Sequence, residues 1–501
     1  SGTVLTGETL VVFVSKPRLS LPETIPAVAV GGSLSLEQRF LNNSGLEFTP
    51  TKWTITGLPP GMTYDRLTGT ITGRATKPGV YIVKVVASNP AGSSAPIQYV
   101  ITVEAFPARS TGQFVGSIAA GTTADDDIGG RIELSTTATG SFTGSIWINS
   151  IRHAISGILN TDAITTGAEA TTAKSRATLN INRGTSLPAL QLAIVLDPAN
   201  DGLTGTLGPI IPPATQPLED SKGAITGWRN VWSTTHPATA RAGRQNVRFA
   251  IPNTDINDPA VPQGDGFATL TVAPGGGTTL NGRAADGSLI VFSSLLGPTG
   301  QVLLYQTPYG SQGSLLGTLQ VADTTQIVSG NVRWYKKNLG PTSTEKNYKD
   351  GFGPLELTAG GLPYTAPNTS QIVVGFPNLS DNARLTLSPL RLDVGGTELE
   401  DSTTSLFRIN LGHSVSLPPA SPSLTIQEIR INPGSGTFTG KVRLTDISES
   451  ITRDTTIQGI FIPSGVPGTA GFGTGYMLLP HLPGTTAEPL LSARVLIEKQ
   501  P

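Results

Sequence analysis

The sequence predicts an all-β protein built from several sandwiches or barrels, and three observations lead to this fold class. Glycine and proline are abundant, with 59 and 39 residues among 501. Charged residues make up only 14%, against roughly 25% in ordinary globular domains. Short runs of Val, Ile and Leu with aromatic residues recur between these turn formers, which is typical of short strands joined by tight turns. We therefore expect very little helix.

Length and composition limit the number of domains and the classes of partner. At roughly 100 to 200 residues per domain, the chain is expected to form about three domains. The net charge is −1 and no basic run exceeds the pair Lys336-Lys337, so nucleic acid is not an expected partner. No stretch of about 18 apolar residues occurs, which argues against membrane insertion. The chain has no cysteine, so neither disulfides nor thiol chemistry contribute.

Residues 1–17 read as a leading strand with no obvious partner. Its apolar side chains are Val4, Leu5, Leu10, Val12 and Val14. Two interpretations stay open. The segment is a strand of an upstream domain or of the next one, or it is donated to the sheet of a neighbouring molecule, because unpaired strand edges accept added strands.

The most specific pattern lies within residues 18–105. Residues 55–73 read ITGLPPGMTYDRLTGTITG and residues 77–89 read KPGVYIVKVVASN, which indicates turns fixed by proline and glycine and then an apolar strand interrupted at Lys84. These stretches resemble the immunoglobulin-like (cadherin-like) modules of large secreted bacterial surface proteins. The resemblance implies an immunoglobulin-like sandwich and an extracellular or cell-surface location, but no reaction. Related cadherin-like modules bind calcium through clustered acidic residues, and only Asp65 lies near this motif, so no calcium is expected in this module.

An internal echo marks the remainder of the chain. Residues 140–148 (GSFTGSIWI) match residues 436–444 (GTFTGKVRL), and each is followed by Ile-Ser-Gly-Ile or Ile-Gln-Gly-Ile. Alternation places six side chains on core faces: Phe142, Ile146, Ile148, Phe438, Val442 and Leu444. The mid-strand Gly144 and Gly440 are expected to make room for a facing ring, a bulge or a bend.

The echo leads us to expect two related β domains after the first, at 108–345 and 346–501. Residues 108–345 also resemble an uncharacterised β-rich region of secreted bacterial proteins that carry immunoglobulin-like modules, and this resemblance implies no activity. The expected fold is therefore an N-terminal immunoglobulin-like sandwich followed by two β-barrel or β-sandwich domains in series.

Few residues are arranged for chemistry. The four histidines stand apart without metal-ligand spacing, and no nucleophile elbow, HExxH or phosphate loop occurs. Asp255 and Asp258 could contribute oxygen ligands to calcium, but we prefer a solvated turn there. We expect no cofactor and no catalytic residues, so the protein is not expected to be an enzyme.

The tryptophans allow a second kind of site. Exposed rings stack on sugars, and the candidates for glycan stacking are Trp147, Trp228, Trp232 and Trp334. A second packed sheet would bury the same rings, and core packing is our preferred interpretation.

These observations lead to two main functional hypotheses. The first is an extracellular structural protein of the bacterial cell surface that associates with copies of itself into a filament or surface layer, with the N-terminal strand as a possible donor. The alternative is an adhesin or the glycan-binding, non-catalytic part of a secreted protein, with cell-surface polysaccharide as its partner. A hydrolase with a diffuse active site is the least supported reading.

Overall fold

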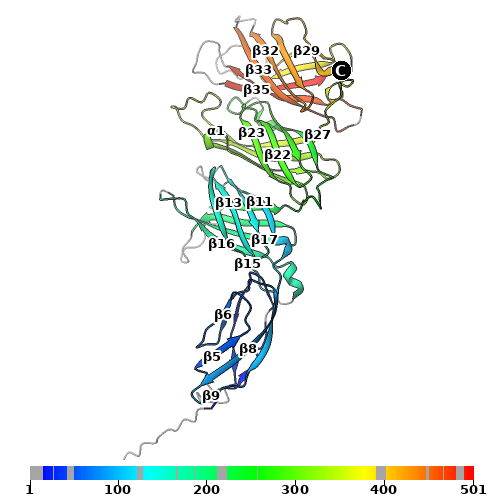
Figure 1. Ribbon diagram of the computed structural model, residues 1–501. Coiled ribbons are helices and arrows are strands. Elements are labelled where there is room, and N and C mark those ends of the chain that lie inside the picture. Colours follow the sequence, from blue (N-terminus) through cyan, green and yellow to red (C-terminus); the bar gives the residue numbers. More distant parts are fainter. Residues whose placement is uncertain are drawn as a thin grey trace, which may run out of the picture. The chain divides into compact units, whose positions relative to one another are not determined.

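The fold is described from a computed structural model (Figure 1). It describes residues 15–25, 27–41, 50–120, 128–164, 167–185, 187–210, 223–256, 258–390, 402–446, 451–466, 468–480 and 490–500. Within these residues the chain is β-structure throughout, apart from short helical turns such as α1 (Pro308–Ser311). The predicted all-β class is confirmed.

Two compact units divide the chain. The first comprises Ser1–Gln113, Leu134–Gly144 and Ala154–Ile210, and the second comprises Phe114–Glu133, Ser145–His153 and Ile211–Pro501.

An immunoglobulin-like domain begins the described chain. Its two main sheets have the strand orders β2 (Val28–Ala29), β10 (Ile97–Glu104), β8 (Gly79–Asn89), β5 (Lys52–Thr56), and β3 (Ser33–Leu36), β7 (Ile71–Arg74), β6 (Met62–Tyr64). A short strand β9 (Gly92–Ser93) pairs with β8, and β1 (Leu19–Ser20) pairs with β4 (Arg39–Phe40). The alternation of β8 buries Val83 and Val85 against the core, as a strand with one inward face requires.

Three larger sheets follow along the chain. The first has the order β14 (Ile151–Ile158), β13 (Ser141–Ile148), β12 (Gly130–Thr136), β11 (Gly112–Ile118), β19 (Gly223–Arg229), β18 (Gly202–Pro209), β17 (Leu190–Asp197), β16 (Ser175–Ile181), β15 (Asn160–Thr161). The second has the order β23 (Leu289–Leu295), β22 (Gly277–Arg283), β21 (Asp265–Val272), β20 (Gly243–Ala250), β27 (Phe352–Pro363), β26 (Val328–Lys336), β25 (Gly313–Val321), β24 (Gln301–Gln306). The third has the order β30 (Val415–Ser416), β29 (Thr403–Ile409), β28 (Ala383–Ser388), β35 (Leu490–Lys499), β34 (Phe472–Pro480), β33 (Ile451–Ile462), β32 (Thr437–Asp446), β31 (Leu424–Asn432).

All three sheets share one topology. In each, the first strand along the chain pairs with the last: β11 with β19, β20 with β27, and β28 with β35. The two ends of each path are strands that follow one another in sequence, β14 and β15, β23 and β24, or β30 and β31. Each sheet is therefore a nearly closed up-and-down barrel.

The order of an immunoglobulin-like sandwich followed by barrel-like sheets agrees with the expectation, but the described residues hold three such sheets where two were expected. The expected boundary at 345/346 falls inside the second sheet, because β27 pairs with both β20 and β26. The expected domain 108–345 thus contains the first sheet and most of the second.

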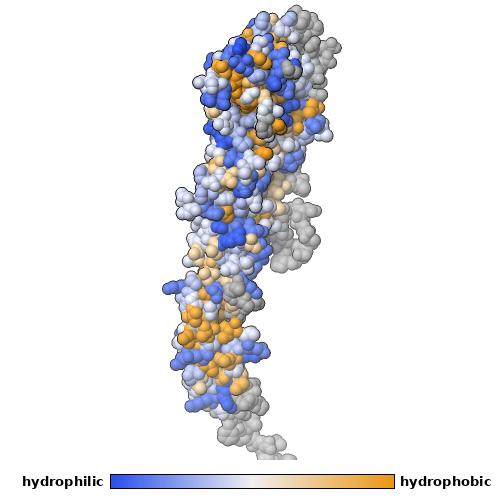
Figure 2. Space-filling model, turned by 90° about the vertical axis from the view of Figure 1, so that its right-hand side faces the viewer, coloured by the Kyte–Doolittle hydropathy of each residue, from blue (hydrophilic) through white to orange (hydrophobic). Residues whose placement is uncertain are grey.

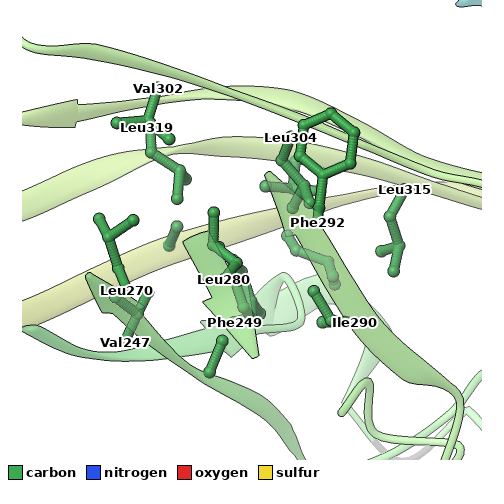
Figure 3. Packing of buried hydrophobic residues seen from close by; sticks show 14 of the residues in the cluster. Val247, Phe249, Leu270, Leu280, Ile290, Phe292, Val302, Leu304, Leu315 and Leu319 are labelled. Atoms are coloured by element: carbon green, nitrogen blue, oxygen red, sulfur yellow. The ribbon is translucent and has the colours of Figure 1, made fainter. Parts of the chain in front are cut away.

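The interior of the second sheet is filled with side chains. Figure 3 shows them pointing toward one another from β20 to β25, including Val247, Phe249, Leu270, Leu280, Ile290, Phe292, Val302, Leu304, Leu315 and Leu319. A similar cluster fills the third sheet. The second and third barrels are packed cores, so a ligand site in this part of the chain lies outside their interiors.

The second and third sheets pack together through β20 and β21 against β33 and β34. Asn246 of β20 is fully buried, and its Nδ2 donates to the carbonyl oxygens of Ser435 at 3.0 Å and Phe461 at 2.9 Å. The buried carboxylate of Asp265 accepts a hydrogen bond from the Thr474 hydroxyl. These hydrogen bonds fix the second sheet against the third, which positions the side chains at their boundary.

Candidate functional site

A polar cleft of about 280 Å³ lies at the boundary between the second and third sheets. The second sheet supplies Arg283 at the end of β22, the turn at 286–288, and Lys336 at the end of β26. The third sheet supplies Gln458 from β33 and Tyr476 from β34. Clefts between packed units are common places for ligand sites.

Tyr309 is directed into this cleft by an unusual turn. Tyr309, Gly310 and Ser311 all have positive φ, at 60°, 60° and 73°. Left-handed backbone costs a non-glycine residue roughly 1–2 kcal/mol, so other contacts must hold the turn. The indole Nε1 of Trp334 donates to the Tyr309 hydroxyl at 3.1 Å, and that hydroxyl donates to Asp286 Oδ2 at 2.5 Å.

Asp286 is the buried acid of the cleft, with only 2% of its surface exposed. Besides Tyr309, its carboxyl accepts the backbone N–H of Ser288 at 3.0 Å, and its carbonyl oxygen accepts Asn347 Nδ2 at 3.1 Å. Burial raises the pKa of Asp286, against the opposing effects of the Tyr309 and Ser288 hydrogen bonds and of the Lys336 charge.

Lys336 lies beside this acid and is 1% exposed. Its ammonium donates to the Asn347 carbonyl oxygen and lies 4.2 Å from the centroid of the Tyr309 ring. Burial lowers the pKa of Lys336, while the negative charges of Glu345 and Asp286 oppose the shift. A buried cation and a buried acid therefore face one cleft, and both contact Tyr309 and Asn347.

The other walls are polar as well. Arg283 donates from Nη1 to the Gly287 carbonyl oxygen at 2.9 Å, which fixes the guanidinium over the turn. Burial raises the pKa of Tyr476 to about 12, so its phenol stays protonated. With Gln458 and Asn347, the cleft offers both hydrogen-bond donors and hydrogen-bond acceptors.

A larger hollow of about 630 Å³ lies elsewhere in the second unit, along the segment that follows β27. Its lining includes Tyr364, Pro367, Ile372, Phe376 and Pro463 but no charged side chain. This lining therefore carries no formal charge, in contrast to the lining of the polar cleft.

The immunoglobulin-like domain carries a separate surface feature. Val80 and Ile82 of β8 and Val100 of β10 are 70%, 63% and 46% exposed, and Ile82 is the register partner of Val100. We refer to these three residues as the outer strip. Figure 2 shows hydrophobic residues gathered over this domain, in the lower part of the view. Lys84 lies at one end of the strip and Glu104, further along β10, at the other.

The four tryptophans proposed for glycan stacking lie in different surroundings. Trp334 is fully buried and Trp228 nearly so, with its Nε1 donating to the Leu295 carbonyl oxygen at 2.9 Å, so neither has a free ring face. Trp147 is half-buried beneath the guanidinium of Arg131, which lies 3.8 Å from its ring centroid. Trp232 is half-buried and stacks on His236. The structure does not bring the four rings together: Trp228 and Trp334 are packed in the core, whereas Trp147 and Trp232 keep part of their surface exposed.

The other candidates from the sequence are the calcium ligands and the donor strand. Asp255 ends the short turn Asn253–Asp255, and Asp258 accepts the backbone N–H of Ala260 at 2.8 Å, as in a solvated turn. Across the described ranges, no three His, Cys, Asp or Glu side chains cluster as metal ligands. The proposed donor-strand residues Val4, Leu5, Leu10, Val12 and Val14 lie outside the described residues.

Sequence reasoning missed the polar cleft. Its residues are distributed from 283 to 478 with no recurring spacing. The only local signal was the Lys336-Lys337 pair, of which Lys336 is buried and Lys337 exposed.

Comparison with known proteins identifies one domain. Residues 25–104 match the family model described as "Putative Ig domain", which confirms the immunoglobulin-like domain predicted at 18–105. Domains of this family typically occur in extracellular and surface proteins. No curated protein matches the chain.

A solved structure described as a "putative alpha-galactosidase" from Bacteroides fragilis is 32% identical over 19% of this chain and 19% of that chain, with a TM-score of 0.16. A likeness of this extent carries no argument about activity. In the part of the chain that the structure describes, no helix has the length and apolarity to cross a bilayer.

Proposed function

We propose that the chain is a non-catalytic structural segment of a secreted bacterial cell-surface protein and that it associates with copies of itself. The observation that carries the proposal is the outer strip, an exposed apolar face on a domain whose core is otherwise well packed. Contiguous exposed apolar side chains on a sheet are typical of contact surfaces.

The occupant we propose for the outer strip is the same face of a second copy. The strip is apolar at its centre and has Lys84 at one end and Glu104 at the other. A two-fold pairing with antiparallel strands brings the Lys84 end of each copy over the Glu104 end of its partner, so the face complements itself in charge. The chain's net charge of −1 adds little long-range repulsion.

Such a two-fold contact closes a pair and does not by itself extend. Growth into a filament or layer needs a second, heterologous contact. Strand donation by residues 1–17 is our proposal for that contact. Ser15, near the C-terminal end of this segment, lies at the end of β8, where its carbonyl oxygen accepts a hydrogen bond from Asn89 Nδ2 at 2.5 Å.

The alternative, a glycan-binding segment of a secreted protein, is favoured by one observation, the polar cleft. Tyr309 and Asp286 are held in it by part-buried hydrogen bonds, from Trp334 to Tyr309 and from Tyr309 to Asp286. The two functions are compatible, because the outer strip belongs to the first unit and the cleft to the second.

Sedimentation velocity of the purified full chain over a range of concentrations tests self-association. Ile82→Lys places a charge in the outer strip, while Val466→Lys makes the same change at a matched exposure of 62% outside it. We expect the wild type and Val466→Lys to form pairs that associate further, and Ile82→Lys to lose the paired species. A deletion of residues 1–14 is expected to stop growth beyond the pair.

Two results would contradict the proposal. One is a wild type with no association tighter than a Kd of about 1 mM. The other is association that Ile82→Lys leaves unchanged, which would place the contact elsewhere on the chain.

A further inference from the structure

We infer that the polar cleft between the second and third sheets binds one neutral, polyhydroxylated ring, such as a single sugar residue. The inference rests on the glycan-binding alternative proposed above and names the class of ligand for that site, and it uses residues other than those of the outer strip.

The size of the cleft limits the ligand to one ring. Its volume of about 280 Å³ lies just below the range for ligand clefts, roughly 300–1,000 Å³. A chain of several rings would have to extend out of it, whereas an ion alone would leave most of the space to water.

The charges of the lining favour a neutral ligand. Two carboxyl groups, Asp286 and Glu345, face two basic groups, Arg283 and Lys336. An anion would meet a carboxylate and a cation would meet a guanidinium or an ammonium, and both contacts are unfavourable in a partly buried site.

The hydrogen-bonding groups favour hydroxyls. Arg283 and Lys336 only donate, an ionised Glu345 only accepts, and the amides of Asn347 and Gln458 do both. A hydroxyl donates one hydrogen bond and accepts others, so a ring carrying several hydroxyls can satisfy this mixed set. A ligand with only donors or only acceptors would leave polar groups of the cleft unpaired, at a cost in affinity.

The site is built before any ligand arrives. Trp334, Tyr309 and Asp286 form a continuous hydrogen-bonded series, and Lys336 packs on the Tyr309 ring. The left-handed backbone at Tyr309 and Ser311 is strained, and such strain persists where surrounding contacts hold it and is found most often at ligand and active sites. Side chains fixed in this way lose little entropy when a ligand binds.

Isothermal titration of the full chain with methyl glycosides of glucose, galactose, mannose and N-acetylglucosamine tests the inference. The variants are Glu345→Ala and Gln458→Ala, both at half-buried positions of the lining, with the exposed Glu356→Ala of β27 as a matched control. At least one glycoside is expected to bind. Each cleft variant is expected to weaken its Kd at least tenfold, and the control is expected to leave it unchanged.

Several outcomes would overturn the inference. They are the absence of any glycoside with a Kd below about 10 mM, binding that both cleft variants leave intact, and binding of inorganic phosphate or magnesium in place of the glycosides. Circular dichroism establishes that each variant is folded, and Gln458→Ala carries the test if Glu345→Ala does not fold. Self-association by the outer strip is expected to be the same in all variants, so failure of one proposal is distinguishable from failure of the other.

Discussion

Phe438 of β32 lies with its ring directly over Gly459, its register partner on β33, where a Cβ would sit only 2.3 Å from the ring carbon Cζ. The same pairing occurs in the first sheet, where a Cβ at Gly157 would sit 3.0 Å from the ring of Phe142. An aromatic ring that covers a glycine on the next strand fills the space left by the missing side chain. The two copies of the internal echo therefore share a structural feature, a phenylalanine ring that covers a glycine on the next strand.

Alanine at these glycines is expected to destabilise the sheets in proportion to the overlap. Gly459→Ala forces the ring of Phe438 and the Thr474 carbonyl to shift, at a cost of about 3 kcal/mol, the upper part of the usual range for overpacking. Gly157→Ala is expected to cost about 1 kcal/mol, because only the ring must give. Native-state hydrogen exchange of the amides of β32, β33 and β14 measures both values.

Gly360→Ala on β27 is the control, because a Cβ there meets nothing within 4 Å. It is expected to change the free energy of opening by less than about 1 kcal/mol. Equal effects at Gly360 and Gly459 would show that ring–glycine packing contributes nothing.

In the immunoglobulin-like domain, Gly69 is expected to tolerate no side chain. Its φ of 74° is left-handed, and a Cβ would lie 2.5 Å from the indole of Trp53. Gly69→Ala is expected to cost at least about 3 kcal/mol, from backbone strain together with the clash. Gly184→Ala, in the turn between β16 and β17 of the first large sheet, separates backbone strain from the clash. Its φ of 87° is left-handed but a Cβ there meets nothing within 4 Å, so a loss of about 1–2 kcal/mol is expected. Denaturant unfolding measures both; a Gly69→Ala variant no less stable than Gly184→Ala would contradict the packing on Trp53.

The buried acid of the cleft predicts a pH dependence of stability. Burial raises the pKa of Asp286, so above its ordinary value of about 4 the folded protein holds a proton that the unfolded chain has released. The folded state then binds more protons, and the free energy of unfolding falls as pH rises through that window. Compared with Asp286→Asn, which cannot titrate, the wild type is expected to lose stability as pH rises above about 4.

Asp65 is expected to give the opposite pH dependence of stability. The backbone N–H groups of Thr68 and Leu67 lower its pKa, so the wild type is expected to lose stability relative to Asp65→Asn as pH falls through about 4 and below. Thermal unfolding at several pH values reports both comparisons. A wild type that gains stability over Asp286→Asn with rising pH would contradict the burial of this acid.

The junction between the second and third sheets is expected to depend on the Thr474 hydroxyl. Thr474→Val keeps the shape but removes the hydrogen bond to the buried carboxylate of Asp265, which is expected to cost about 2 kcal/mol. Thr279→Val, at an exposed position of β22, is expected to stay within about 0.5 kcal/mol of the wild type. Hydrogen exchange of β21 and β34 amides distinguishes them; equal protection in the two variants would contradict a structural role for this bond.

Much of the fold could be predicted from local pattern. The six side chains assigned to core faces from alternation, from Phe142 to Leu444, are all buried. For Gly440, the structure shows one of the expected alternatives, a bulge. Gly440 makes room for the Glu428 carbonyl and the Ile457 side chain beside a register shift in β31, as expected of a bulge, whereas the rings lie over Gly157 and Gly459.

The number of sheets could not be predicted, because closure depends on strands far apart in sequence. β20 pairs with β27, and nothing in either segment signals the partner. The internal echo led us to expect two related domains, but its two copies occupy different places in their sheets. The hairpin β13–β14 contains the third and fourth strands of its sheet, whereas β32–β33 contains the fifth and sixth.

The polar cleft and the outer strip could not be predicted from the sequence, for related reasons. Asp286, Lys336 and Tyr476 come from three separate segments that only the packing of two sheets brings together. The nearly continuous apolar run around Val80 and Ile82 was visible, but an apolar strand reads the same whether its second face is covered or exposed.

The most direct test of the central claim, self-association of a structural chain, is electron microscopy of the purified protein. We expect wild-type protein to form regular filaments or sheets, protein lacking residues 1–14 to stop at pairs, and Ile82→Lys to disrupt the pairing. Wild-type protein that remains as separate single molecules at every concentration would contradict the claim.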